Sequence, residues 1–172
     1  MTTVPVDIQR AVELEGIPAD EALERFARAA LEDVGGDPDV TLRIVDEAEG
    51  RALNRRWRGK DSPTNVLSFP AARVPGLPDE AAPAFLGDVV VCAPVVAAEA
   101  ARQGKAAEHH WAHLVIHGIL HLRGFDHTSE PMASEMESEE RARLAGLGIS
   151  DPYAEPGRDG TAGEPSNPSR TS

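Results

Sequence analysis

The spacing of apolar residues along the chain predicts a mixture of strands and helices. Apolar residues alternate with polar ones, or form short β-branched runs, over residues 4–14, 40–45, 65–69 and 86–93, which predicts four strands. Helical spacing covers residues 19–34, 46–58, a segment beginning at Pro94, residues 106–123 and about 132–144. Asp20 and Asp46 are the expected N-caps of the first two helices, which we expect to end near Gly35-Gly36 and Gly59.

Strands and helices do not alternate strictly, so the pattern favours an α+β fold over a doubly wound one. We expect one domain over residues 1–150, built from a small mixed sheet of about four strands packed with several helices. The proline-rich residues 71–84 are expected to form a loop. Residues 151–172 consist mainly of Gly, Pro, Ser and acidic residues, with Tyr153 as their one aromatic, and we expect a disordered tail.

The amino-acid composition indicates whether the chain can form a core and in which cellular compartment it is expected. Hydrophobic residues make up 41% of the 172 positions, which suffices for a core, although aromatics contribute only 4%. The single cysteine, Cys92, excludes an intramolecular disulfide and suits a reducing compartment. The chain has no apolar stretch long enough for a membrane span, and its N-terminus lacks the basic and apolar regions of a secretory signal. The expected location is therefore the cytoplasm, with no membrane partner.

The net charge of −12 argues against a polyanionic partner until its distribution is considered. Residues 51–73 contain six basic residues and one acid, a local charge of +5. Residues 128–140 contain five glutamates and no basic residue, a local charge of −5. A basic patch therefore exists within an acidic chain.

The strongest chemical signal is the stretch HGILHLRGFDH over residues 117–127. His117 and His121 are four residues apart on a predicted helix, so both imidazoles lie on one face and can share a metal ion. Gly124 can end the helix in the left-handed conformation and turn the chain so that His127 supplies a third ligand. Three imidazoles leave a tetrahedral zinc ion one open position, as in catalytic zinc sites. We predict one zinc ion per chain.

This spacing is the one found in metzincin proteases, so the predicted zinc helix is metzincin-like. Gly118 stands where those proteases place their general-base glutamate, which removes the usual route to peptide hydrolysis. His113 and His117 are also four apart, but that shifted pair has no glycine turn and third histidine in register. His113 is therefore expected to support the ligands or to pack in the core. Asp126 is expected either to orient a ligand or to cap the chain locally.

A second informative segment is LNRRWRGKDSPTNVLSFP, residues 53–70. Its basic residues either form a solvated helix face or point into a cleft, and Arg58 and Lys60 lie in or beside a predicted loop. This segment, LGDVVVC and the HGILHLRGFDH stretch followed by Met136-Glu137 stand in the order and spacing of the YbeY family, which the chain resembles over about residues 4–148. Trp57 and Phe125 replace tyrosines that are usual in that family.

The resemblance implies a metal-dependent endoribonuclease that cleaves single-stranded RNA, matures the 3′ end of small-subunit rRNA and takes part in ribosome quality control. It implies that His117, His121 and His127 bind zinc and that Arg58 is a catalytic arginine near the metal. It also implies a small-subunit ribosomal protein and an Era-type GTPase as partners. Arg55 and Lys60 are the neighbouring basic residues expected to bind substrate phosphates.

Two other functions remain open from the sequence. A metallopeptidase is favoured by the histidine spacing and opposed by Gly118. A non-catalytic ribosome assembly factor with structural zinc would need a fourth protein ligand, for which Cys92 and the remaining histidines are the soft candidates.

Overall fold

In the computed structural model, residues 6–34, 39–70, 85–125 and 128–152 are described, and they form an α+β fold. Within these ranges the strands are β1 (Val6–Arg10), β2 (Asp39–Val45), β3 (Val66–Pro70) and β4 (Phe85–Cys92). The helices are α1 (Asp20–Leu31), α2 (Glu47–Arg58), α3 (Ala93–Gln103), α4 (Ala107–Leu122) and α5 (Glu130–Gly146). The predicted fold class is confirmed, and none of the described helices is long and apolar enough to cross a membrane.

The four strands form one mixed sheet in the order β1-β2-β4-β3. β1 and β4 both run parallel to β2, whereas β3 runs antiparallel to β4 and forms an edge of the sheet. β4 is a central strand buried on both faces, which explains its continuous β-branched sequence. Val89 and Val91 contribute to the larger core, while Val90 and Cys92 contribute to a smaller core on the other face.

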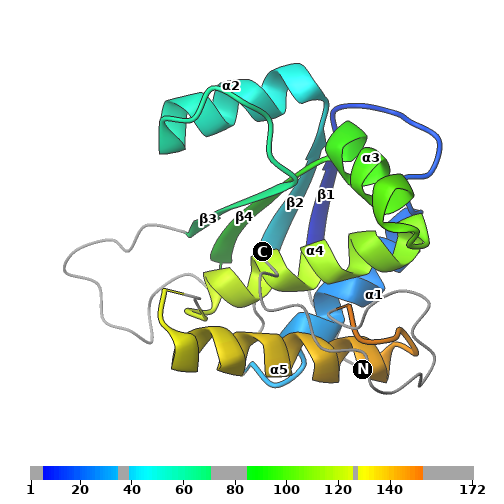
Figure 1. The fold of residues 1–172 in the computed structure, drawn as a ribbon, viewed down its shortest axis with the longest axis vertical. Coiled ribbons are helices and arrows are strands. Elements are labelled where there is room, and N and C mark those ends of the chain that lie inside the picture. The colour runs from blue at the N-terminus through cyan, green and yellow to red at the C-terminus, as the bar shows by residue number, and fades with distance from the viewer. Residues whose placement is uncertain (1–5, 35–38, 71–84, 126–127, 153–172) are drawn as a thin grey trace, which may run out of the picture.

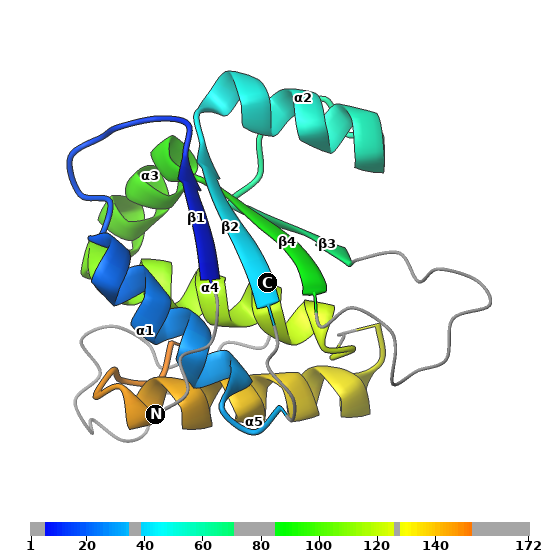
Figure 2. The same ribbon diagram turned by 180° about the vertical axis from the view of Figure 1, so that it is seen from behind.

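The helices form layers on both faces of this sheet (Figure 1). α4 and α1 cover one face, and α5 packs on the outer side of these two helices (Figures 1 and 2). α2 lies over the opposite face (Figure 2). The larger core lies between the sheet and α1, α4 and α5 and includes the ring of Trp111, which is 2% exposed.

The predicted ends of α2 and α4 are confirmed in detail. Asp46 is the N-cap of α2 and accepts a hydrogen bond from the backbone N–H of Glu49, and Gly59 ends the helix in the left-handed conformation. At the end of α4, Gly124 has a φ of 103°. Its N–H donates to the carbonyl of His121, and the N–H of Phe125 donates to Leu120, which together form a Schellman motif.

Other predicted boundaries were wrong by a few residues, and the errors in β1 and α1 have a tertiary cause. β1 ends at Arg10 because its partner strand β2 ends there as well. Arg10 pairs with Ile44, one residue before the end of β2, and Asp46 then caps α2. α1 begins after Ala19 without a side-chain cap, and Asp20 instead accepts a hydrogen bond from Arg10. The predicted glycine stop of α1 and the predicted loop over 71–84 lie outside the described residues.

α1 ends at Leu31, before that glycine pair, where two arginines from other helices bind its last carbonyls. Arg123, at the end of α4, donates to the carbonyl of Ala30, and Arg143 of α5 donates to Ala29. Carbonyls of the last helical turn have no partner within the helix, so cationic donors stabilise this end. These contacts join α1, α4 and α5 and thereby fix α5 relative to the helix that carries the histidines.

Candidate metal centre

α4 carries a row of histidines on one face because they recur every four residues. His113, His117 and His121 occupy successive turns of this helix. The ring centroids of His117 and His121 lie 4.9 Å apart, and those of His113 and His117 lie 6.2 Å apart. The predicted juxtaposition of His117 and His121 on one helix face is therefore present in the fold.

A carboxylate from α5 lies directly behind this row. The side chain of Glu140 is fully buried, at 0% exposure. Its Oε2 lies 2.6 Å from Nδ1 of His117, and its Oε1 lies 2.9 Å from Nε2 of His113. Because an ionised carboxylate can only accept, each of these two ring nitrogens carries the proton. In His117 the lone pair is then on Nε2, the nitrogen suited to coordinate a metal ion.

The charge states follow from the same contacts. Burial by itself would raise the pKa of Glu140, but the hydrogen bonds from His113 and His117 outweigh it and lower that pKa to about 2. Burial lowers the pKa of His113, despite the opposing effect of Glu140. At neutral pH the arrangement is therefore an ionised carboxylate that accepts a hydrogen bond from neutral His113, so burial of this charge is compensated by hydrogen bonds.

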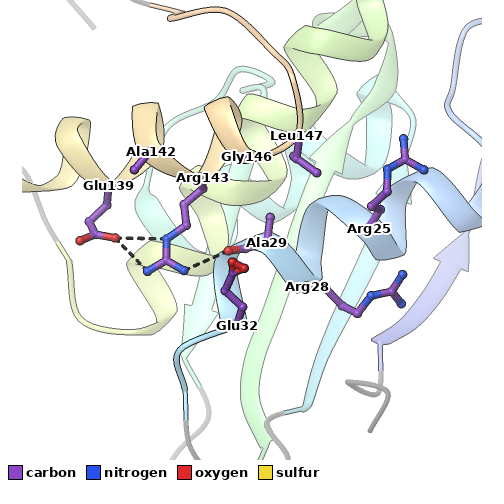
Figure 3. Close-up of a pocket in the computed structure, with 9 residues that line it drawn as sticks. All are labelled: Arg25, Arg28, Ala29, Glu32, Glu139, Ala142, Arg143, Gly146 and Leu147. Carbon is purple, nitrogen blue, oxygen red and sulfur yellow. Dashed lines mark hydrogen bonds and ion pairs between the residues drawn. The ribbon is translucent and has the colours of Figure 1, made fainter. Parts of the chain in front are cut away.

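Glu140 reaches the histidines because it lies on the buried face of α5. Met136, Glu140 and Leu144 are the three buried residues of this helix, and their spacing of four places them on one face. The adjacent Glu139 accepts two hydrogen bonds from Arg143, whose guanidinium also donates to the carbonyl of Ala29 on α1 (Figure 3). This clamp fixes the register of α5 and hence the position of Glu140.

A hollow of about 470 Å³ lies beside this clamp, between α1 and α5 (Figure 3). Its lining includes Arg25, Arg28 and Arg143 but none of the histidines of α4. All three arginines form ion pairs with acidic side chains, Arg143 with both Asp33 and Glu139. The hollow is therefore best understood as part of the interhelical joint and not as the reactive site.

The described residues offer a donor set that can hold a metal ion. Donor atoms of His113, His117 and Glu140 all lie within 4.8 Å of one another. Imidazole nitrogens and a carboxylate oxygen are ligands that zinc accepts, so the chemistry of the cluster fits a metal centre. His121 stands next to this set, beside His117. His127 and Asp126 lie outside the described residues, so the triad of His117, His121 and His127 stays a prediction.

Gly118 has a structural role that explains why a larger residue is absent. Its carbonyl accepts a hydrogen bond from the hydroxyl of Ser68 in β3, so α4 lies very close to the sheet here. A Cβ atom at position 118 would stand 2.7 Å from Cγ1 of Val89 and 3.3 Å from Oγ of Ser68. The stiff side chain of Val89 cannot yield readily. Position 118 therefore faces the sheet, and a glutamate does not fit there.

The basic residues lie on the other layer of the molecule. Arg58 ends α2, Arg55 lies one turn earlier and Lys60 follows the helix; all three are exposed. Within the described ranges, none of these three side chains forms an ion pair, unlike Arg51, which binds Asp61. The C-terminal ends of α2 and α4 lie on the same side of the molecule, that of edge strand β3 (Figures 1 and 2).

The fold and this cluster define an α+β protein with a candidate metal centre between α4 and α5. Comparison with known proteins shows which one: the chain belongs to the YbeY family, whose model, described as endoribonuclease YbeY, matches residues 9–148. A protein of that name from Halorhodospira halophila is 56% identical over 138 residues, covering 80% of this chain and 89% of the relative. Another from Pseudomonas putida is 54% identical over 151 residues, covering 87% and 93%.

A solved structure supports the same fold. The solution structure of a Thermotoga maritima protein is similar with a TM-score of 0.55 and 28% sequence identity. The match covers 87% of this chain and 99% of that protein. The resemblance inferred from the sequence motifs is thus confirmed over most of the chain. The metzincin-like character of the zinc helix is not confirmed by these findings and stays a prediction.

Proposed function

We propose that this protein is a zinc-dependent endoribonuclease that cleaves single-stranded RNA. The observation that carries the proposal is the combination of membership in a family described as endoribonuclease YbeY with a histidine row fixed by a buried carboxylate. A phosphodiester substrate also suits the unpaired cations at the end of α2, because phosphate oxygens accept strong hydrogen bonds from guanidinium groups.

In this proposal His117, His121 and His127 hold one zinc ion per chain. When bound, zinc supplies Lewis acidity that activates water as a nucleophile and polarises a phosphoryl oxygen. Glu140 acts behind the ligands: its contact with Nδ1 of His117 sets the ring orientation and the tautomer that directs Nε2 outward. Glu140 is not the general base, because its fully buried carboxylate already accepts from two histidines.

Arg58 is proposed to act on the substrate, where its planar guanidinium would stabilise negative charge developing on the phosphoryl oxygens. Arg55 and Lys60 are proposed to bind flanking phosphates and so to place the scissile bond near the histidines. The exposure of these three side chains and their lack of ion pairs within the described segments support these roles, because their donors are accessible to a phosphate.

The biological setting proposed here is maturation of the 3′ end of small-subunit rRNA and ribosome quality control in the cytoplasm. A small-subunit ribosomal protein and an Era-type GTPase are the proposed partners. These assignments rest on the family to which the chain belongs.

The alternatives are weaker. A metallopeptidase would need a general base near the metal, and position 118 has no room for the glutamate that metzincins use. An assembly factor with structural zinc would need a fourth protein ligand, and Cys92 is ruled out as that ligand because it is buried in the smaller core on the face of the sheet opposite α4.

Metal removal tests the proposed enzyme directly. The purified full chain is expected to contain about one zinc ion, as three histidine ligands with an open position require. Treatment with a chelator should abolish cleavage of a single-stranded RNA, and added zinc should restore it. The measurement is elemental analysis paired with a gel-based cleavage assay on the same preparation. Zinc-independent cleavage would contradict the mechanism, and zinc binding without any cleavage would favour the assembly factor.

Glutamine at position 140 should weaken zinc binding about 10–100-fold, the usual cost of losing a partner that orients a metal ligand. The amide keeps the shape of the carboxylate but has a single acceptor oxygen, so it cannot accept from both His113 and His117. The measurement is zinc affinity by competition with a chromophoric chelator.

Glu135→Gln is the matched control, because it removes the same charge from an exposed glutamate of the same helix, outside the Glu139–Arg143 clamp. The nitrogen chemical shifts of His117 in the metal-free protein provide a second readout, since they report its tautomer. Equal zinc affinity in Glu140→Gln and Glu135→Gln would show that Glu140 does not position the ligands.

A further inference from the structure

Trp57 is the most exposed of the large apolar side chains in the described residues, at 60% exposure. It lies in the last turn of α2, a helix whose last turn also carries Arg55, Arg56 and Arg58. A tryptophan in such a position contributes little to the core, whereas Trp111, the other tryptophan of the chain, is 2% exposed. Its exposed ring therefore calls for an explanation outside the fold itself.

The ring of Trp57 is nevertheless held in place. Its centroid lies 6.0 Å from that of Phe69 on β3, with an interplanar angle of 66°, an edge-to-face contact. Phe69 in turn packs against the smaller core, so it forms a fixed support. The guanidinium carbon of Arg56 lies 5.3 Å from the centroid of the Trp57 ring. A large aromatic surface that is exposed but already oriented loses little conformational entropy when a planar ligand stacks on it.

The surroundings of Trp57 are cationic. Arg55, Arg56, Arg58 and Lys60 are exposed, and in the described part of the chain none of them forms an ion pair. The full chain carries a net charge of −12, so this group of basic residues stands out against an acidic chain. Its charge complements that of a phosphate backbone.

Edge strand β3 connects this surface to the histidine row. Phe69 contacts Trp57, while the adjacent Ser68 donates its hydroxyl hydrogen to the carbonyl of Gly118 on α4. Gly118 directly follows His117. Because neighbouring residues of a strand point to opposite faces, β3 separates the basic end of α2 from the metal helix by a single strand at the edge of the sheet.

We propose that Trp57 is a base-stacking subsite for single-stranded nucleic acid, which crosses the edge at β3 to reach the histidines of α4. The base rests on the ring of Trp57, and the cations around it bind the adjoining phosphates. Exposed aromatic rings beside basic residues are the usual means of binding single strands, whose bases are accessible, and they do not suit duplexes, whose bases are stacked inside. The identity of the ligand as RNA rests on the proposed function.

Binding of a 2′-O-methyl single-stranded RNA, which resists cleavage, tests the subsite. At fixed salt, Trp57→Ala should bind about 5–150-fold more weakly than the wild type, the fold-change that corresponds to one lost stacking contact. Trp57→Phe should retain part of the affinity because it keeps a ring. Leu14→Ala is the matched control, since Leu14 is 42% exposed and lies in the segment after β1, at the opposite edge of the sheet.

Tryptophan fluorescence supplies an independent readout. A base stacked on Trp57 should quench its emission, while buried Trp111 provides the constant background, and Trp57→Phe should show no such quenching. A duplex of the same sequence should bind without quenching. Stronger competition by an acidic peptide than by single-stranded RNA would overturn the nucleic-acid subsite in favour of a protein partner.

Failure of the subsite and failure of the proposed enzyme give different results. If the wild type cleaves RNA and Trp57→Ala binds it equally well, the stacking subsite is wrong and the endoribonuclease stands. If quenching and tight single-strand binding occur but no preparation cleaves RNA, the subsite stands and the enzymatic proposal is wrong.

Discussion

Replacing His121 by alanine is expected to remove most of the bound zinc and with it the RNA cleavage. The two imidazoles of His117 and His121 are one helical turn apart, with ring centroids 4.9 Å apart, and a zinc ion that loses one of three protein ligands is poorly held. The fold should survive, because His121 is only partly buried and the residues around it on α4 remain packed in the core. The measurement is zinc content by elemental analysis, with cleavage measured on the same sample.

His109→Ala is the matched control, since His109 is an exposed histidine at the start of the same helix. This variant should keep both zinc and activity. Full zinc occupancy in His121→Ala would show that the ligand frame is wrong. The ion would then belong to His113, His117 and Glu140, whose donor atoms lie within 4.8 Å of one another, and His113→Ala would be the variant that loses it.

The parts of the fold that could be predicted from sequence are those set by local chemistry. Asp46 and Gly59 define the ends of α2 because capping and left-handed termination depend on a few neighbouring residues. Gly124 ends α4 for the same reason. The β-branched run of β4 predicts a buried strand whatever its neighbours are.

The order and direction of the strands in the sheet could not be predicted from local sequence signals. That β3 is antiparallel and forms an edge depends on pairing between segments separated along the chain. The end of α1 is another case, because it is set by Arg123 and Arg143, which lie about a hundred positions later in the sequence. Local signals near residue 31 contain no information about these distant donors.

Glu140 is the site residue that sequence reasoning missed. It is one of five glutamates between residues 128 and 140, a composition typical of a solvated helix face. Its burial comes from the docking of α5 on α4 and α1. One signal was present: Glu140 lies midway between Met136 and Leu144 at a spacing of four, so it interrupts the apolar stripe of the helix. A charged residue in an apolar stripe needs a buried partner, and the histidines of α4 are those partners.

The role of His113 was left open between supporting the ligands and packing, and the structure resolves part of that question. Its Nε2 contacts Glu140, so it supports the carboxylate that contacts His117. His110 has a comparable arrangement one turn earlier, where it binds Glu99 of α3, which also accepts from Asn65. Histidines of this helix thus contact two different carboxylates, and the Glu140 group lies next to His121 through His117.

Variants of Arg58 are expected to affect the action on the substrate without affecting the binding of the metal ion. Arg58→Ala should leave zinc content and thermal stability nearly unchanged, because this exposed side chain forms no ion pair within the described residues and buries little surface. Cleavage of single-stranded RNA should fall about 10²–10³-fold, the typical cost of removing one donor that stabilises transition-state charge. Arg58→Lys should recover only part of this loss, since an ammonium group cannot make the two parallel hydrogen bonds that a guanidinium makes to phosphate.

The decisive comparison uses Arg25→Ala as the control for the Arg58 variants. Arg25 is a half-exposed arginine of α1, away from β3, and its loss changes the net charge by the same amount. All variants are assayed with a single-stranded RNA at matched zinc content and fixed salt, because phosphate contacts make affinity strongly salt-dependent. The proposal requires Arg25→Ala to cleave like the wild type and Arg58→Ala to be slow even at saturating RNA. Equal rates for Arg58→Ala and Arg25→Ala would show that Arg58 takes no part in the reaction. Cleavage that persists in the Arg58→Ala variant after zinc is removed would mean that the observed activity belongs to a contaminating nuclease.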